Sequence, residues 1–283
     1  MYINKYQEIQ RSFSYKIRNF IRLLILDILS IGIKYRYKNL LKTPRIQLVY
    51  IHHIFDDEIK IFDTIISDLK KIYKIIPLSE AIDRIYNNDI DQPYLSFSSD
   101  DGFKSNLNAH KVFKKHNIKA CFFLCSDFIG LDKFDYIKQI CNDKFHLPPI
   151  EFLNFKDVKF LLSQGHEIGS HTTNHSNLKT LNLPELKSVI LDSYHTLHNL
   201  FGSVKHFSFP YGTKKHFPDH AREIVSKSGF TSCISAIRGC HLNQTKEINK
   251  EQILIKRDIL DVNYNINHVL YFMVNNIKNE KRN

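Results

Sequence analysis

Residues 94–102 read Tyr94-Leu95-Ser96-Phe97-Ser98-Ser99-Asp100-Asp101-Gly102. A short apolar run that stops at two carboxylates and a glycine is typical of a buried strand followed by a turn. Six other short apolar runs with strand-like composition occur along the chain, and segments with helical spacing of apolar residues lie between them. This alternation predicts βα units around a parallel sheet. The predicted strands are Ile46–His53, Tyr94–Ser99, Lys119–Leu124, Glu167–His171, His206–Phe209, Thr231–Ala236 and Ile253–Lys256.

Helices are expected between these strands, and the resulting fold class is α/β. Seven strands without a dinucleotide-binding glycine motif favour a (β/α)7-type barrel over an open doubly wound sheet. An N-terminal helical arm precedes the first strand, so the expected domains are an arm over residues 1–45 and a catalytic domain over residues 46–283. The expected helices of the barrel lie near residues 58–73, 104–116, 133–142, 155–164, 184–201, 215–228 and 263–277.

Polar residues follow four of the predicted strands. In barrels of this class the reactive groups lie on the loops after the carboxyl ends of the strands. Four such strand ends on one face therefore predict a single site. The groups are His52-His53, Asp100-Asp101-Gly102, His171 to His175 and Pro210-Tyr211-Gly212.

The adjacent carboxylates Asp100 and Asp101 can divide two roles between them. Side chains alternate in direction along a strand, so one carboxylate can bind a metal while the other faces a substrate. Taken alone, Asp-Asp-Gly favours a simple turn. The spacing of His171 and His175 changes this balance, because residues four apart on a helical turn bring two imidazoles within reach of one ion. Two histidines and one carboxylate form a metal-ligand set that leaves open positions for water and substrate.

Four segments with these residues resemble motifs of the polysaccharide deacetylases (carbohydrate esterase family four). The resemblance covers roughly residues 46–260, with the motifs in the family's order, and is closest to the poly-N-acetylglucosamine deacetylase branch. It implies a distorted form of the (β/α)7 barrel. The segments are Val49-Tyr50-Ile51-His52-His53-Ile54, Leu95 to Gly102, Gly165 to His175, and Phe207-Ser208-Phe209-Pro210-Tyr211-Gly212.

The resemblance implies that a divalent metal, usually zinc, is bound by Asp101, His171 and His175. Asp100 would be the general base that activates the attacking water. A metal lowers the pKa of bound water toward ~7, so a carboxylate can complete the activation. The developing oxyanion would be held by the backbone N–H of Tyr211, in a turn that Pro210 makes rigid. Pro210 is also expected to contact the substrate.

The general acid is less directly implied. Most of the family supplies a histidine from a late Leu-x-His motif, and this chain has no convincing copy of that motif. His268 lies in a helix-like stretch and is interpreted as structural. In the poly-N-acetylglucosamine branch the histidine lies near the start, so the resemblance implies His52 as the acid, with His53 as the fallback and a substrate contact.

The chain departs from the family at two positions. The third motif usually begins with an arginine that holds the catalytic Asp, and Ser208 occupies the corresponding position here. Arg257 follows the last predicted strand, resembles a late arginine of the branch, and is expected to take over this role. Ser99 replaces the usual Phe before the Asp pair, which is expected to loosen the local packing.

The arm carries most of the positive charge. Residues 1–45 contain ten Lys/Arg and two Asp/Glu, so they contribute 10 − 2 = +8 of the total net charge of +11. Residues 20–33 are strongly apolar, which nucleic-acid-binding tails are not, and no nucleic-acid partner is expected. The run is shorter than a membrane-spanning helix and contains Arg22 and Asp27. Two interpretations remain open: a helix that lies in a membrane interface, and a helix that packs on the domain.

The five cysteines do not predict a disulfide framework. Their number is odd and they lack paired Cys-x-x-Cys spacing, so buried free thiols and a reducing compartment are expected. The expected localisation is cytoplasmic, at the inner face of a membrane.

The leading functional hypothesis is hydrolysis of the N-acetyl group of an N-acetylhexosamine in a glycan or lipid-linked saccharide. Two alternatives remain open. The same site could remove O-acetyl groups, since ester and amide hydrolysis share a tetrahedral intermediate, or the chain could be a carbohydrate-binding protein with a decayed site. A third functional class, a protein that binds a lipid surface or nucleic acid, would be supported by the arm alone.

Overall fold

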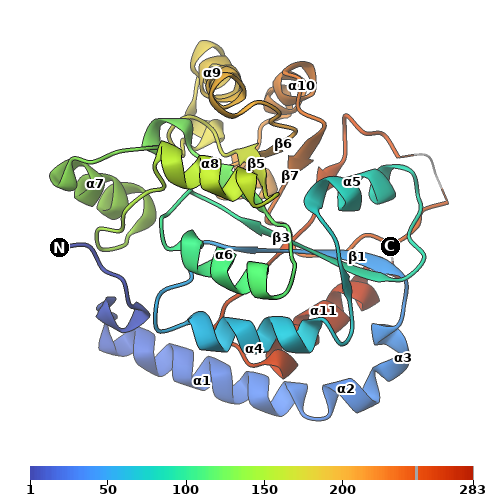
Figure 1. The fold of residues 1–283 in the computed structure, drawn as a ribbon. Helices are drawn as coiled ribbons and strands as arrows, with labels where there is room; N and C mark the ends of the chain where they lie inside the picture. Colours follow the sequence, from blue (N-terminus) through green and yellow to red (C-terminus); the bar gives the residue numbers. More distant parts are fainter. Residues whose placement is uncertain (246–247, 283) are drawn as a thin grey trace.

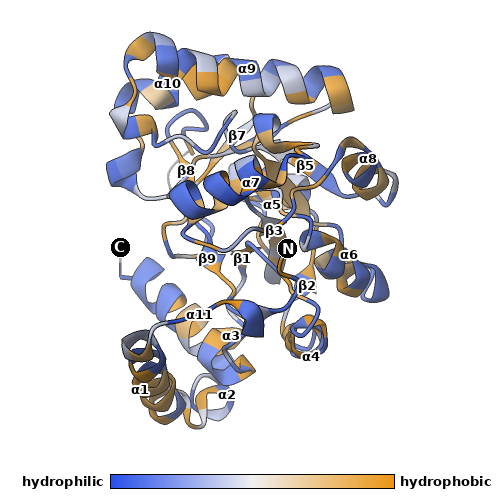
Figure 2. Cartoon of the chain, turned by 90° about the vertical axis from the view of Figure 1, so that its left-hand side faces the viewer, coloured by the Kyte–Doolittle hydropathy of each residue, from blue (hydrophilic) through white to orange (hydrophobic). Residues whose placement is uncertain are grey.

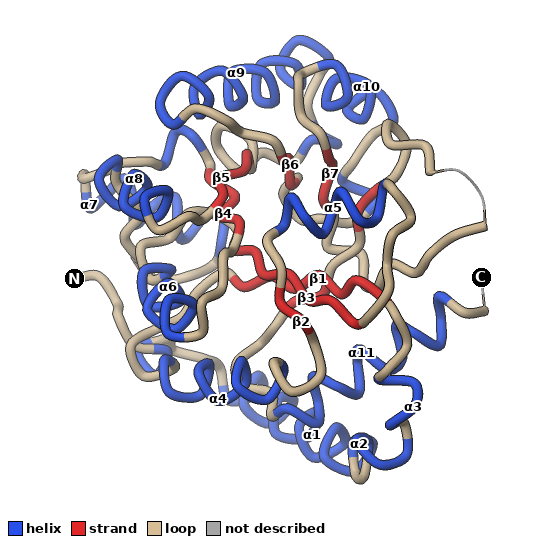
Figure 3. The backbone as a smooth tube through the Cα atoms, turned by 45° about the vertical axis from the view of Figure 1, so that its right-hand side comes forward, coloured by secondary structure: helices blue, strands red, loops and turns tan. Residues whose placement is uncertain are grey.

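A computed structural model of the chain describes residues 1–245 and 248–282. Its centre is a parallel sheet that curls into a barrel, with helices packed around the outside (Figures 1 and 3). Within the described residues the sheet contains nine strands in the order β8-β7-β6-β5-β4-β3-β1-β9, and β2 pairs with β3. The prediction of a (β/α)7-type barrel is confirmed. The strands are β1 (Arg45–Ile51), β2 (Lys74–Ile75), β3 (Pro93–Ser99), β4 (Cys121–Leu124), β5 (Glu167–Ser170), β6 (His206–Ser208), β7 (Ser232–Ile234), β8 (Leu254–Ile255) and β9 (Asp258–Ile259).

The helices of the barrel connect successive strands, and three of them begin at asparagine caps. The side chains of Asn154, Asn182 and Asn265 accept backbone N–H groups in the first turns of α8, α9 and α11, which satisfies donors that a helix start leaves unpaired. The α-helices are α1 (Phe13–Ser30), α2 (Ile33–Arg36), α3 (Lys38–Leu41), α4 (Ile59–Leu69), α5 (Leu78–Tyr86), α6 (Asn106–Lys115), α7 (Phe134–Ile140), α8 (Phe155–Ser163), α9 (Leu183–Phe201), α10 (Asp219–Lys227) and α11 (Ile266–Glu280). Short 3-10 helices cover Tyr6–Glu8, Ser126–Phe128, Leu178–Thr180 and Lys214–His216, and a π-helix covers Cys141–Phe145.

The two edges of the sheet are joined by the chain itself. β8 pairs with β7 at one edge, and β9 pairs with β1 at the other. Only Lys256 and Arg257 separate these two short strands, so the chain crosses the seam of the barrel at Arg257. This crossing carries the Arg257 side chain into the barrel.

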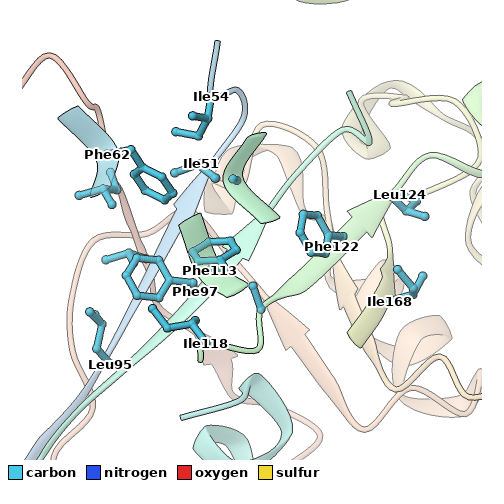
Figure 4. Packing of buried hydrophobic residues seen from close by; sticks show 14 of the residues in the cluster. Ile51, Ile54, Phe62, Leu95, Phe97, Phe113, Ile118, Phe122, Leu124 and Ile168 are labelled. Carbon is cyan, nitrogen blue, oxygen red and sulfur yellow. The ribbon is translucent and has the colours of Figure 1, made fainter. Parts of the chain in front are cut away.

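The largest core lies between the sheet and the surrounding helices. Phe97 of β3 and Phe113 of α6 pack with ring centroids 5.4 Å apart, and Phe62 of α4 lies against Phe113 at 5.6 Å. These residues are fully buried together with Ile51 and Leu95 (Figure 4). Burial on both faces of the strands explains why they read as continuous apolar runs.

The helix α5 and strand β2 were not predicted. The apolar side chains of α5 pack on those that point into the barrel, including Ile46 and Phe123. Ser79 at the start of α5 bonds to Glu167 and His206, the first residues of β5 and β6. The helix therefore closes the end of the barrel at which strands begin, as its place inside the ring of strands in Figure 3 indicates.

Residues 1–45, the arm, pack on the rest of the chain at both ends. Near the N-terminus, Asp57 accepts the backbone N–H of Tyr6, and Ile9 is buried. Farther along, α1 lies beside α11 (Figure 1), where Asp27 Oδ1 is 2.7 Å from Nε2 of the buried His268. This contact supports the structural interpretation of His268.

Two further features follow from the structure. All five cysteines are free and buried, as predicted. None of the helices described is long and apolar enough to cross a bilayer.

Candidate active site

The polar segments that follow β1, β3, β5 and β6 meet at one end of the barrel. All strand pairs among β1, β3, β4, β5 and β6 are parallel, so the carboxyl ends of these strands lie at this same end. The sequence prediction of a single site on one face agrees with this arrangement.

Asp101, His171 and His175 form the centre of the site. One carboxylate oxygen and one nitrogen from each ring all lie within 4.8 Å of one another, and all three residues are buried. Oδ1 of Asp101 is 3.4 Å from Nε2 of both histidines. Burial by itself would raise the pKa of Asp101, but the neighbouring imidazoles of His171, His175 and His52 hold that pKa below its ordinary value.

The hydrogen bonds around this cluster fit a bound cation. Nδ1 of His171 lies 2.7 Å from the carbonyl oxygen of Ser208. A carbonyl only accepts, so Nδ1 carries the proton and Nε2 is free to present its lone pair toward Asp101. Oδ1 of Asp101 is buried and receives no hydrogen bond from the residues described. Acceptor atoms from three residues face a common point, which suits a metal such as zinc.

The backbone at the site is held in an unusual conformation. Asp101, Thr172, His175 and Tyr211 all have positive φ, between 59° and 72°. Non-glycine residues seldom adopt this left-handed region, and such residues cluster at functional sites. The loops after β3, β5 and β6 therefore carry local strain that aims these side chains.

Asp100 is held by Arg257. Nη1 of Arg257 donates to Oδ1 of Asp100 at 2.8 Å, and Nη2 donates to Oδ2 at 2.6 Å. The same guanidinium donates to the hydroxyls of Ser98 and Ser208, at 3.0 and 2.5 Å. Both charged groups are almost fully buried. The expected contact between Arg257 and Asp100 is present, and Ser208 takes part in it.

His52 and His53 lie in different surroundings. Nε2 of His52 is 4.0 Å from Oδ2 of Asp101, and the side chain is 36% exposed. His53 turns the other way and packs against the rings of Phe55 and Phe103, with centroids 5.2 and 4.4 Å away. Burial lowers the pKa of His53 to about 3. His52 faces the cluster, and His53 belongs to an aromatic wall beside it.

The turn after β6 brings Pro210 and Tyr211 to the cluster. Tyr211 is 47% exposed, and its ring lies 5.2 Å from that of His175. Gly212 follows it and packs directly on Ala236, where an added Cβ would lie only 2.2 Å from the alanine Cβ. A glycine is required at this close approach, and the contact fixes the turn that presents Tyr211.

Several residues at the site were not singled out from the sequence. The ring of Phe145, in the π-helix, lies 4.7 Å from that of His175. Arg11 and Tyr15 of the arm line a cavity of about 210 Å³ together with His52 and His53. No motif indicates these residues. Their positions depend on how the arm and the segment 141–150 fold over the barrel edge.

Comparison with known sequences identifies the family. The sequence model described as polysaccharide deacetylase matches residues 87–233, just over half of the chain. The chain belongs to the polysaccharide deacetylase family. A peptidoglycan-N-acetylglucosamine deacetylase of Bacillus cereus is 32% identical over 100 residues, which cover 35% of this chain and 28% of that protein. The chain thus matches little more than a quarter of this relative's length.

Solved deacetylase structures share the fold of this polysaccharide deacetylase family member. The Streptococcus pyogenes deacetylase PplD, solved in complex with acetate, aligns with a TM-score of 0.64 at 16% identity, over 82% of this chain and 99% of that chain. IcaB from Ammonifex degensii aligns with a TM-score of 0.63 at 14% identity, over 82% and 97% of the two chains. The shared fold thus extends well beyond the residues that the family model matches.

The family match covers only part of the site. Asp100, Asp101, His171, His175 and the turn at Tyr211 lie inside residues 87–233. His52 and Arg257 lie outside them. The roles of these two residues therefore depend on the geometry described above.

Proposed function

We propose that this chain is a metal-dependent deacetylase that hydrolyses the N-acetyl group of an N-acetylhexosamine in a glycan or lipid-linked saccharide. The observation that carries the proposal is the buried cluster of Asp101, His171 and His175 beside the arginine-bound carboxylate of Asp100. Family membership supports a glycan substrate, and the name of the Bacillus cereus relative supports N-acetylglucosamine.

Zinc is the metal that we propose for the cluster. Two imidazole nitrogens and one carboxylate oxygen form a donor set that zinc favours and that leaves positions open. When bound, the metal supplies a Lewis acid that polarises the amide carbonyl and increases the acidity of the attacking water. The hydrogen bond from His171 to the carbonyl of Ser208 keeps Nε2 directed at the metal position,.

Asp100 is the proposed general base. Its two oxygens each receive one hydrogen bond from Arg257, and each retains a lone pair that can accept a proton from water,. Arg257 orients the carboxylate and compensates its charge in the barrel interior, so it is a positioning residue.

His52 is the proposed general acid that protonates the leaving amine. It is partly exposed and lies next to Asp101, whereas His53 has a pKa that burial lowers to about 3. A histidine with that pKa holds no proton to donate at neutral pH. His53 is better suited to form the wall of the substrate site.

The turn at Pro210 and Tyr211 is the proposed oxyanion-binding element. Pro210 restricts its own φ, and the contact of Gly212 with Ala236 fixes the other side of the turn,. A fixed backbone N–H at Tyr211 would stabilise the charge that develops on the carbonyl oxygen. The exposed Tyr211 ring would form part of the substrate site together with Pro210.

The experiment that tests the proposal combines metal analysis with acetate release. Purified protein is assayed for bound zinc, and acetate is measured after incubation with N-acetylglucosamine oligomers. Near-stoichiometric zinc that Asp101→Ala removes, with acetate release that Asp100→Asn abolishes, is the expected result. Release from O-acetylated sugars alone would favour the esterase alternative, and absence of zinc from the wild type would remove the basis of the proposal.

The localisation of the protein is a separate prediction. A cytoplasmic position at the inner membrane face depends on the arm and not on the site.

A further inference from the structure

The outward face of α1 is apolar. The side chains on this face are between 44% and 79% exposed, although a helix on a protein surface ordinarily directs its polar side chains outward,. We call them the outer face of α1: Phe13, Ile17, Phe20, Ile21, Leu24, Ile25, Ile28, Leu29 and Ile31, the last being the residue after the helix.

The outer face is one continuous stripe. Phe13, Ile17, Phe20, Leu24 and Ile28 follow each other at intervals of three or four residues, which places them on one side of an α-helix. Leu26 and Ser30 are buried on the opposite side, where α1 meets α11. The helix therefore has enough apolar surface to cover α11 and a second apolar face that nothing in the described chain covers.

The position of α1 in the fold leaves this face open. Figure 2 shows α1 at the edge of the molecule beside α11, coloured largely as hydrophobic. An apolar patch of this extent on one surface marks an interaction site.

Positive charge surrounds the outer face. At 100° per residue, Arg18 and Arg22 lie along one border of the stripe and Lys16 along the other. Further cations follow in α2 and α3, and the arm has a net charge of +8 from ten Lys/Arg and two Asp/Glu. Asp27 is the only carboxylate of α1, and it is bound to His268.

We propose that the outer face of α1 binds the surface of an anionic phospholipid bilayer, with the helix axis parallel to the membrane plane. Apolar side chains in the centre with lysine and arginine at the borders match the boundary between acyl chains and headgroups. Docking of a second copy on the same face would bring two arms of charge +8 together, which opposes association. The charge of the arm thus favours a lipid surface over a second copy.

Bilayer docking would also place the active site close to the membrane. Tyr15 in the first turn of α1 and Arg11 just before it line the cavity that His52 and His53 share. A substrate at the membrane surface, such as a lipid-linked saccharide, could then reach the site. This consequence rests on the proposed function, whereas binding of the bilayer does not.

Vesicle flotation of the purified full chain tests the inference. The probe is a vesicle of equal parts phosphatidylglycerol and phosphatidylcholine, compared with pure phosphatidylcholine. The test variant is Phe20→Glu/Leu24→Glu on the outer face. Its matched control is Tyr136→Glu/Leu200→Glu, which replaces an aromatic and a leucine of similar exposure on α7 and α9.

The wild type and the control are expected to float with anionic vesicles. The outer-face variant is expected to bind at least about tenfold more weakly, since its two substitutions replace large apolar side chains that the bilayer would bury. Lys16→Gln/Arg18→Gln is expected to weaken binding to anionic vesicles and to reduce its dependence on salt. Unchanged thermal unfolding would show that the substituted surface positions leave the fold intact.

Two outcomes would overturn the inference. One is equal vesicle binding by the outer-face variant and its control. The other is absence of binding of the wild type to anionic vesicles; a dimer that Phe20→Glu/Leu24→Glu dissociates would then make the outer face an interface between copies. Acetate release from soluble oligomers, measured in parallel, reports the proposed function separately, because neither Phe20 nor Leu24 lies at the active site.

Discussion

Arg257 and Asp100 form a buried two-point ion pair, with Nη1 to Oδ1 at 2.8 Å and Nη2 to Oδ2 at 2.6 Å. The guanidinium also lies against the ring of Tyr50, 4.4 Å from its centroid. Ser208 occupies the position at which the motif resemblance leads us to expect an arginine. Its short side chain leaves room for the guanidinium and accepts one of its hydrogen bonds. Arg257, which lies between β8 and β9, thus supplies Asp100 with the positive charge that an arginine of the third motif would supply.

The first prediction concerns Arg257. Arg257→Ala leaves Asp100 buried and unpaired, so we expect kcat to fall about 100-fold as the carboxylate loses its orientation, and the free energy of unfolding to fall by about 3–5 kcal/mol. Arg257→Lys should recover little, because an ammonium cannot form both parallel hydrogen bonds. Zinc content should remain unchanged in both variants. The measurements are kcat, KM, metal content and denaturant unfolding.

A second-site variant controls for a general loss of structure. Arg257→Ala/Ser208→Arg returns the arginine to the position of the third motif. Recovery of kcat beyond that of Arg257→Ala would show that the role is positional. If Arg257→Ala has full kcat, Asp100 is oriented by another group and the assignment of Arg257 is wrong.

The second prediction concerns the metal ligands. Asp101→Ala and His171→Ala each remove one of three converging donor atoms, and we expect both to lose bound zinc and activity together,. Zinc should also stabilise the wild type, by about 2.7 kcal/mol at a free concentration 100 times its Kd. His216→Ala is the control, because that ring lies 4.9 Å from Tyr211 but outside the cluster. Loss of zinc in the control as well would point to a global effect.

The barrel and the centre of the site were predictable from the sequence because they depend on local patterns. A buried parallel strand reads as a short apolar run, and polar residues after its end must lie at the common edge of the sheet. For this reason the sequence predicts that Asp101 and His171, which are 70 residues apart in the chain, lie close together.

Other features depend on contacts that local patterns do not encode. α5 has apolar residues at Leu78, Ala81, Ile82 and Ile85, which is a helical spacing, but its segment is short and lies in the chain between β2 and β3, two strands that pair with each other. The choice between His52 and His53 required the register of β1, since adjacent side chains point to opposite faces. The sequence of α1 does not indicate that its apolar stripe faces outward. The same spacing of apolar residues would result if the stripe packed on the rest of the chain.

The third prediction separates His52 from His53. If His52 protonates the leaving amine, His52→Ala should lower kcat for amide substrates by about 10²- to 10⁴-fold. The loss should be much smaller for an aryl acetate, whose leaving group departs without a proton. His53→Ala should instead raise KM through the loss of its aromatic contacts. Equal defects of His52→Ala on both substrates would assign His52 to binding and not to proton transfer.

The fourth prediction concerns acid stability and depends on His206. Its two ring nitrogens lie 2.9 and 2.8 Å from the hydroxyls of Ser79 and Ser232, and burial lowers its pKa to about 3. In the unfolded chain the pKa is ordinary, about 6.5. Between pH 6.5 and 3 the unfolded state therefore binds one more proton, so this contribution to stability is complete above pH 6.5 and is lost as the pH falls.

His206→Gln removes this proton linkage while retaining an amide that can hydrogen-bond. The variant is expected to be less stable than the wild type at pH 7.5, because the fit between α5 and β6 is altered. At pH 5 the difference should narrow by about 2 kcal/mol, from 1.5 pH units at roughly 1.4 kcal/mol each. Glu58 and Asp258, whose pKa values burial raises to about 7 and about 6, act in the opposite sense but equally in both proteins. Denaturant unfolding at the two pH values measures the difference, and a gap that stays constant would show that His206 is protonated alike in the folded and unfolded chains.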